Sequence, residues 1–102
     1  MDKDKPFLMT IDDIFNLKNR GTVVAGTIKQ GVITKGGEVE VGYPGKIIVK
    51  TTIAGIEMLN PPPKNWEKCG LLFKGDNIDQ IKPGMMIAAP GLLSNLDQLD
   101  ET

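Results

Sequence analysis

Short β-branched and apolar segments, each bounded by glycine or proline residues, recur along almost the whole chain. Glycine accounts for 12 of the 102 residues, whereas aromatic residues make up only 5%. This composition favours many tight turns over long helices. Several short strands at regular spacing are typical of an all-β barrel or sandwich. We predict a closed antiparallel barrel of six or seven strands, because closure hides the strand edges.

Turn residues bound each expected strand. The strands are expected over residues 7–17, 21–31, 38–41, 46–58, 66–73 and 85–89. Asp12-Asp13 predicts a turn or bulge, Gly26 a bulge or close backbone approach, and Gly55 a bend. Alternation of polar and apolar residues over 38–41 predicts a half-buried strand. Residues 78–81 are expected to form one helical turn, and the prolines at 61–63 an extended loop.

The chain is long enough for one domain with one core. We assign residues 6–91 to the barrel and expect the charged residues 1–5 to be frayed. Residues 92–102 form an acidic tail, for which we expect disorder in preference to a short helix. In the helical alternative, Leu93, Leu96 and Leu99 would lie on one face and cover barrel surface.

Composition excludes several kinds of chemistry within this chain. Histidine is absent, and the chain has a single serine, Ser94, and a single cysteine, Cys69. A Ser-His-Asp triad, a Cys-His pair and a zinc site of His and Cys therefore cannot be assembled. The Gly45-Lys46 pair is followed by isoleucine, so no phosphate-binding P-loop is present. We expect a non-enzymatic protein that holds no cofactor, metal or GTP.

Charge and hydropathy indicate a soluble protein whose net charge is not typical of a nucleic-acid-binding domain. The formal net charge is −1, from 12 Lys+Arg and 13 Asp+Glu. Residues 6–91 carry 10 Lys+Arg against 8 Asp+Glu, a net charge of +2, which is far from the footprint of a nucleic-acid-binding domain. Neither a membrane-spanning run nor a secretory signal is present. We therefore expect a cytoplasmic protein with no membrane partner, and a monomer by default.

Some individual residues allow a functional and a structural interpretation. Asp12-Asp13 could hold a cation or act as an acid and base pair, but adjacent strand residues point to opposite faces, which favours a solvated turn. Cys69 lies in an apolar segment and is interpreted as a small buried thiol. Trp66 could stack on a base of RNA while Lys64 and Lys68 neutralise its phosphates. We favour the alternative that the tryptophan covers the mouth of the barrel. The methionines 58, 85 and 86 are interpreted as core residues.

A series of short blocks gives the chain a specific resemblance to a known family. The blocks are Lys5-Pro-Phe-Leu-Met-Thr-Ile-Asp-Asp-Ile-Phe15, Arg20-Gly-Thr-Val-Val-Ala-Gly26, Gly31-Val-Ile-Thr-Lys-Gly36, Glu38-Val-Glu-Val41, Ala54-Gly-Ile-Glu-Met58, Gly70-Leu-Leu-Phe-Lys-Gly75, Ile81-Lys-Pro-Gly84 and Ala89-Pro-Gly91. In order and spacing they closely resemble the second domain of translation elongation factor Tu. The resemblance extends over residues 6–91.

The resemblance implies a closed antiparallel barrel of the translation-factor type. In that family the barrel follows a GTPase domain, helps to hold the aminoacyl end of tRNA and touches the small ribosomal subunit. The present chain contains neither the GTPase domain nor the third domain, so we expect a free-standing barrel. The implied partners are the tRNA acceptor end or the ribosome, bound weakly, and a GTPase or other protein in trans.

The resemblance also implies a binding site. Phe15, Leu17, Glu57 and Leu72 stand at positions that resemble the pocket for the terminal adenosine, and we add Arg20 and Lys68 as RNA-binding residues.

Three residues depart from the family pattern. Asn60 and Lys68 stand where the family has arginine and asparagine, and Asn19 replaces a glycine. The alternative interpretation is therefore a protein-interaction module that has lost RNA binding.

Overall fold

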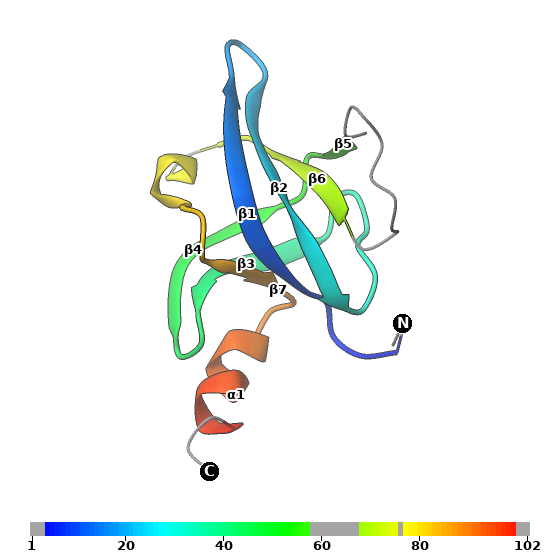
Figure 1. The fold of residues 1–102 in the computed structure, drawn as a ribbon, viewed down its shortest axis with the longest axis vertical. Helices are drawn as coiled ribbons and strands as arrows, with labels where there is room; N and C mark the ends of the chain where they lie inside the picture. The colour runs from blue at the N-terminus through cyan, green and yellow to red at the C-terminus, as the bar shows by residue number, and fades with distance from the viewer. Residues whose placement is uncertain (1–3, 58–67, 76, 100–102) are drawn as a thin grey trace.

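A single antiparallel sheet organises the molecule (Figure 1). The computed structural model describes residues 4–57, 68–75 and 77–99. Its strands follow the order β4-β3-β7-β1-β2-β6-β5, so the prediction of an all-β antiparallel fold is confirmed. The elements are β1 (Leu8–Leu17), β2 (Gly21–Gln30), β3 (Glu38–Tyr43), β4 (Lys46–Thr52), β5 (Gly55–Glu57), β6 (Lys68–Phe73), the 3-10 helix η1 (Ile78–Gln80), β7 (Met86–Ala88) and α1 (Leu92–Leu99).

The two edge strands of the sheet are neighbours in the sequence. Only Ile53 and Ala54 separate β4 from β5. Ile53 exchanges hydrogen bonds with Gly36 and Gly37, at 2.8 and 3.0 Å, and the Ala54 N–H donates to the Leu72 carbonyl at 2.8 Å. Within the described ranges no strand pairing joins β4 to β5, so hydrogen bonds do not close the sheet into a ring.

The prediction of a single strand over residues 46–58 is wrong, because the segment forms two strands. The chain leaves β3 after Thr52 and reaches β6 at Gly55, so one segment becomes two strands with different partners. At the break, the Ile53 side chain is buried in the core. The last residue of that expected strand, Met58, lies outside the described part of the chain, as does the expected proline loop at 61–63.

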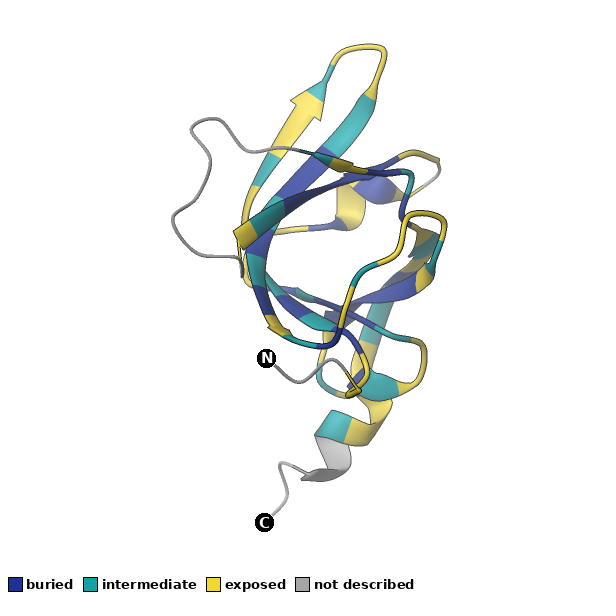
Figure 2. Ribbon diagram, turned by 90° about the vertical axis from the view of Figure 1, so that its right-hand side faces the viewer, coloured by how far each residue is buried: buried dark blue, intermediate teal, exposed yellow. Residues whose placement is uncertain are grey.

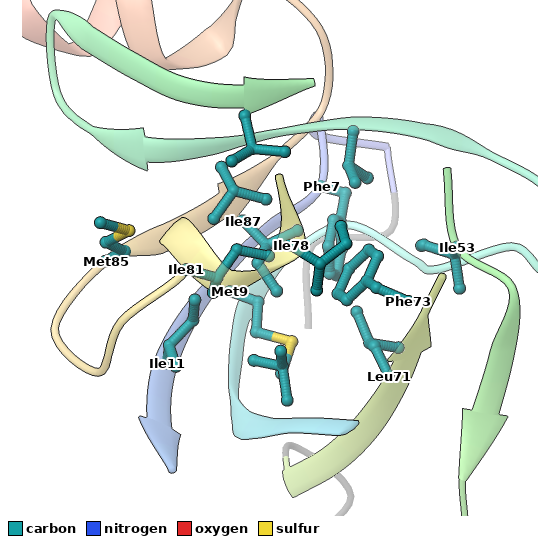
Figure 3. Packing of buried hydrophobic residues seen from close by; sticks show 14 of the residues in the cluster. Phe7, Met9, Ile11, Ile53, Leu71, Phe73, Ile78, Ile81, Met85 and Ile87 are labelled. Carbon is teal, nitrogen blue, oxygen red and sulfur yellow. The ribbon is translucent and has the colours of Figure 1, made fainter. Parts of the chain in front are cut away.

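The core lies on the concave side of the curled sheet (Figures 2 and 3). Alternate residues of β2 and β6 point inward, and Val24, Leu71 and Phe73 are fully buried there. η1 adds Ile78, which confirms the expected helical turn, and Ile81 follows it into the same cluster. Of the predicted core methionines, Met85 is buried in the cluster, Met86 is half-buried and Met58 lies outside the described residues.

A bulge divides β1 into two halves. The register with β2 shifts between Ile11 and Asp13, so Asp12 is the extra residue, as the sequence allowed. Gly26 stands opposite Ile11, and a side chain there would collide with the Thr10 carbonyl. The predicted close backbone approach at Gly26 is thus confirmed, and it explains why this buried strand position has no side chain.

The C-terminal segment differs from the expected disordered tail. Residues Leu92–Leu99 form α1, which begins beside β3 and β4 (Figure 1). The Leu93 side chain is fully buried, and its carbonyl accepts a hydrogen bond of 2.8 Å from the Gly45 N–H. Docking of this first turn supplies the packing that a short helix needs in order to form.

Glu40 corrects the expectation that β3 is half-buried with its polar residues exposed. Its side chain is buried although its neighbours Val39 and Val41 point into the core, and it contacts the chain that precedes α1. Its Oε1 accepts a hydrogen bond of 2.9 Å from the Gly91 N–H, and its Oε2 lies 3.8 Å from Lys50 Nζ. The carboxylate therefore anchors the start of α1 to the sheet.

No helix in the described residues is both long enough and apolar enough to cross a membrane.

Replacing Gly26 by alanine should destabilise the protein by about 1–3 kcal/mol, because the new methyl group overlaps the Thr10 backbone. Urea denaturation measures the free energy of unfolding. Gly55→Ala is the matched control, since a methyl group there meets only ordinary contacts. Equal stability of the two variants would contradict the close approach.

Glu40→Ala should lower the free energy of unfolding by about 1.5–3 kcal/mol, because the Gly91 N–H loses a charged acceptor. Amide exchange at Leu92 and Leu93 should accelerate as the helix loses its anchor. The exposed neighbour Glu38, replaced by alanine, serves as control. Unchanged exchange in Glu40→Ala would show that α1 docks without the carboxylate.

Candidate nucleic-acid interface

Four adjacent strands bring the candidate residues to one face of the sheet. Phe15 pairs with Val23, Val23 pairs with Leu72, and Leu72 pairs with Gly55, which makes one row across β1, β2, β6 and β5. Paired residues point to the same side of a sheet, and so do residues two apart along a strand. The same side therefore carries the remaining strand residues of the predicted site, namely Leu17, Glu57 and Lys68.

This side is opposite the core. Val24, Leu71 and Phe73, which alternate with the row just described, belong to the core cluster. We call the outward side of β1, β2, β6 and β5 the outer face. Arg20 joins it from the β1–β2 turn, where Asn19 adopts a left-handed conformation with φ of 66°. The turn expected at residues 19–21 is thus present.

An ion pair connects the turn to β5. Arg20 Nη2 donates to Glu57 Oε1 at 3.2 Å, although the two residues are 37 positions apart. The Arg20 side chain is 62% exposed and that of Glu57 28% exposed, so the pair lies at the surface. Exposed pairs of this kind contribute little to stability. The guanidinium has five N–H donors, and among the described residues one of them is used in this bond.

A small apolar group lies at the centre of the outer face. Val23 and Leu72 are buried although they point away from the core cluster. Phe15, in the same row, is 48% exposed. A flat aromatic surface beside aliphatic side chains can receive the face of a nucleobase.

The second cation of the face is also paired. Lys68 Nζ lies 3.0 Å from Asp12 Oδ2, and the same oxygen accepts a hydrogen bond of 3.2 Å from Thr27 Oγ1. Asp12 and Asp13 are exposed, but they lie in a strand bulge and not in a turn. Sequence reasoning missed the Asp12–Lys68 pair, since it depends on β2 standing between β1 and β6.

The positive charge of the face is concentrated at the hairpin end. Lys18 and Lys74 are exposed, and Lys74 lies beside Gly21, next to Arg20. At the other end, Lys68 is balanced by Asp12, with Asp13 close by in the sequence. A phosphate would therefore be attracted to the β1–β2 turn, whereas the end of the face that holds the Lys68–Asp12 pair would attract it little.

Several predicted residues lie outside the described ranges, namely Asn60, Lys64 and Trp66 together with the prolines at 61–63. In residues 4–57, 68–75 and 77–99, no group of three or more His, Cys, Asp or Glu side chains is placed to hold a metal ion. No protein-family model matches this chain.

Cys69 sits in β6, half-buried, with its Sγ 3.7 Å from Met9 Sδ. Burial raises the pKa of its thiol to about 11. The neutral thiol is thus favoured at physiological pH, which makes Cys69 a poor nucleophile. The predicted buried thiol is half-buried in the structure.

Alkylation of Cys69 by iodoacetamide at pH 8 should be about a hundredfold slower in the folded protein than in urea, because the thiolate population falls with the raised pKa. The rate should increase steadily up to about pH 11. Mass spectrometry of samples quenched over time gives both rates. Rapid labelling of the folded protein would contradict the assignment of an inert thiol.

Proposed function

We propose that this chain is a non-enzymatic, translation-factor-like barrel module whose outer face binds the single-stranded acceptor end of tRNA, with ribosomal RNA as a related partner. One observation carries the proposal. The four residues that resemble the adenosine pocket of a tRNA-binding domain lie on one side of four adjacent strands. Lys68 lies on the same side, and Arg20 lies in the turn at its end. Their sequence positions run from Phe15 to Leu72.

A closed barrel of the translation-factor type is part of this proposal. The sheet curls around one core, and its edge strands are separated by only two residues. Ile53 and Ala54 make backbone hydrogen bonds on both sides of that break, to the chain before β3 and to β6. These bonds support closure by chain continuity where strand pairing is missing.

The chemistry of the outer face fits a nucleotide end. The Phe15 ring, which is 48% exposed, offers an apolar surface for a base, and Arg20 lies at the turn of the same hairpin. Base stacking on an aromatic side chain contributes roughly 1–3 kcal/mol and tolerates different sequences. Glu57, only partly exposed, adds hydrogen-bond acceptors beside this surface.

An RNA hairpin with a single-stranded acceptor end should perturb the amide signals of Phe15, Arg20 and Glu57 in a nuclear magnetic resonance titration. Phe15→Ala should weaken binding at least about fivefold through lost stacking. The matched control is Tyr43→Ala, which removes another exposed aromatic ring from the far end of β3. Equal affinities of the two variants would contradict the site.

A second candidate, a protein-interaction module that has lost RNA binding, is favoured by one specific observation. Arg20 is paired with Glu57 and Lys68 with Asp12, so the two carboxylates offset much of the attraction of these cations for phosphate. Salt separates the candidates. Two phosphate contacts on a single strand predict about sevenfold weaker binding between 50 and 200 mM salt, whereas an apolar protein interface should respond little.

A further inference from the structure

The outer half of β1 has an open edge. β7 pairs with β1 only over Leu8–Thr10. Ile11 is the last residue bonded on that side, through Met85 and Gly84. From Asp13 to Leu17, β1 has β2 on one side and no strand on the other within the part of the chain that the structure describes.

The backbone at this edge is directed outward at alternate residues. In an antiparallel pair, successive residues present their N–H and C=O groups to opposite sides of the strand. The Ile14 N–H donates to Asp13 Oδ1 at 3.0 Å, which marks Ile14 as a residue that faces the open side. Asn16, two positions along, faces the same way. The Asp13 carboxylate thus covers one donor of the edge.

A groove runs along this edge. It has a volume of about 380 Å³ and lies between β1 and the segment that contains η1. Ile14, Ile78 and Ile81 give it an apolar lining, and the two isoleucines beyond β1 are buried in the core cluster. A site with open main-chain groups beside apolar side-chain space is the arrangement that receives an added strand.

The charges of the groove favour a cationic occupant. Asp13 and Asp79 are exposed in its lining, and Lys82 is the cation there. None of the three forms an ion pair with another described residue. The lining therefore has a net negative charge, which would attract lysine or arginine and repel nucleic acid.

We propose that β1 binds an extended segment of a partner protein at residues 13–17, by strand addition, and that this segment alternates aliphatic residues with lysine or arginine. The aliphatic side chains lie against the isoleucines of the groove, and the cations meet Asp13 and Asp79. The segment displaces the Asp13 carboxylate from the Ile14 N–H. Phe15 and Leu17 point to the outer face, so this site is separate from the proposed RNA site.

The test is a titration of the full chain with the peptide acetyl-KVKVKVK-amide, followed by nuclear magnetic resonance. Amide shifts should concentrate at Ile14, Asn16, Ile78 and Ile81. A second peptide, acetyl-EVEVEVE-amide, reverses the charge. A third keeps the charge but carries an N-methyl group at every residue, which removes the main-chain donors from both edges of the peptide. Both should fail to produce these shifts.

A matched pair of variants tests the charge. Asp79→Lys should weaken binding of the lysine peptide about fivefold or more, since it replaces attraction by repulsion. Glu38→Lys makes the same change at an exposed position on β3, away from the groove, and should leave the affinity unchanged. The fold of both variants is checked from the remaining amide signals.

Three results would overturn the proposal. Equal binding of the N-methylated peptide would exclude strand addition, and equal binding of the glutamate peptide would exclude the role of Asp13 and Asp79. Concentration-dependent shifts at the same amides before any peptide is added would identify a second copy of the chain as the occupant.

Discussion

The bulge at Asp12, opposite Gly26, is the constraint on which the rest of the structure depends. Before the bulge, β1 is flanked by β2 and β7 and contributes Met9 and Ile11 to the core. After it, β2 is the one described strand that pairs with β1, and the two strands form the arm that extends beyond the rest of the sheet (Figure 1). A bulge bends its strand and increases the local twist. Gly26 makes this possible, because its bare backbone lets β2 approach Thr10.

The arm has two distinct surfaces as a consequence. Its outer face carries Phe15 and Leu17, and its turn carries Arg20, which reaches across to Glu57 on β5. Its free edge presents Ile14 and Asn16 to the groove beside η1. The outer face is positive at the turn, whereas the groove is negative. Under the two proposals above, one hairpin serves two kinds of partner, an anionic one at the turn and a cationic one in the groove.

Sequence patterns predicted the local features well. Glycine and proline marked the turns, Gly26 marked the close approach, and Asp12-Asp13 marked the bulge. The patterns failed where a distant segment covers a strand. Glu40 has the alternation of an exposed residue, but the chain entering α1 buries it. The split between β4 and β5 was missed because both halves have similar apolar composition and differ only in their partners.

The residues of the candidate site came from the sequence, but their pairing did not. Lys68 and Asp12 are 56 positions apart, and Arg20 and Glu57 are 37 apart. The sequence by itself determined an all-β chain with glycine turns, and no histidine-dependent chemistry. Only the tertiary structure decided which cations are neutralised, which strand edge is open and where the C-terminal helix docks. The physical reason is that composition and side-chain periodicity act within a strand, whereas strand order sets which charges and backbone groups meet.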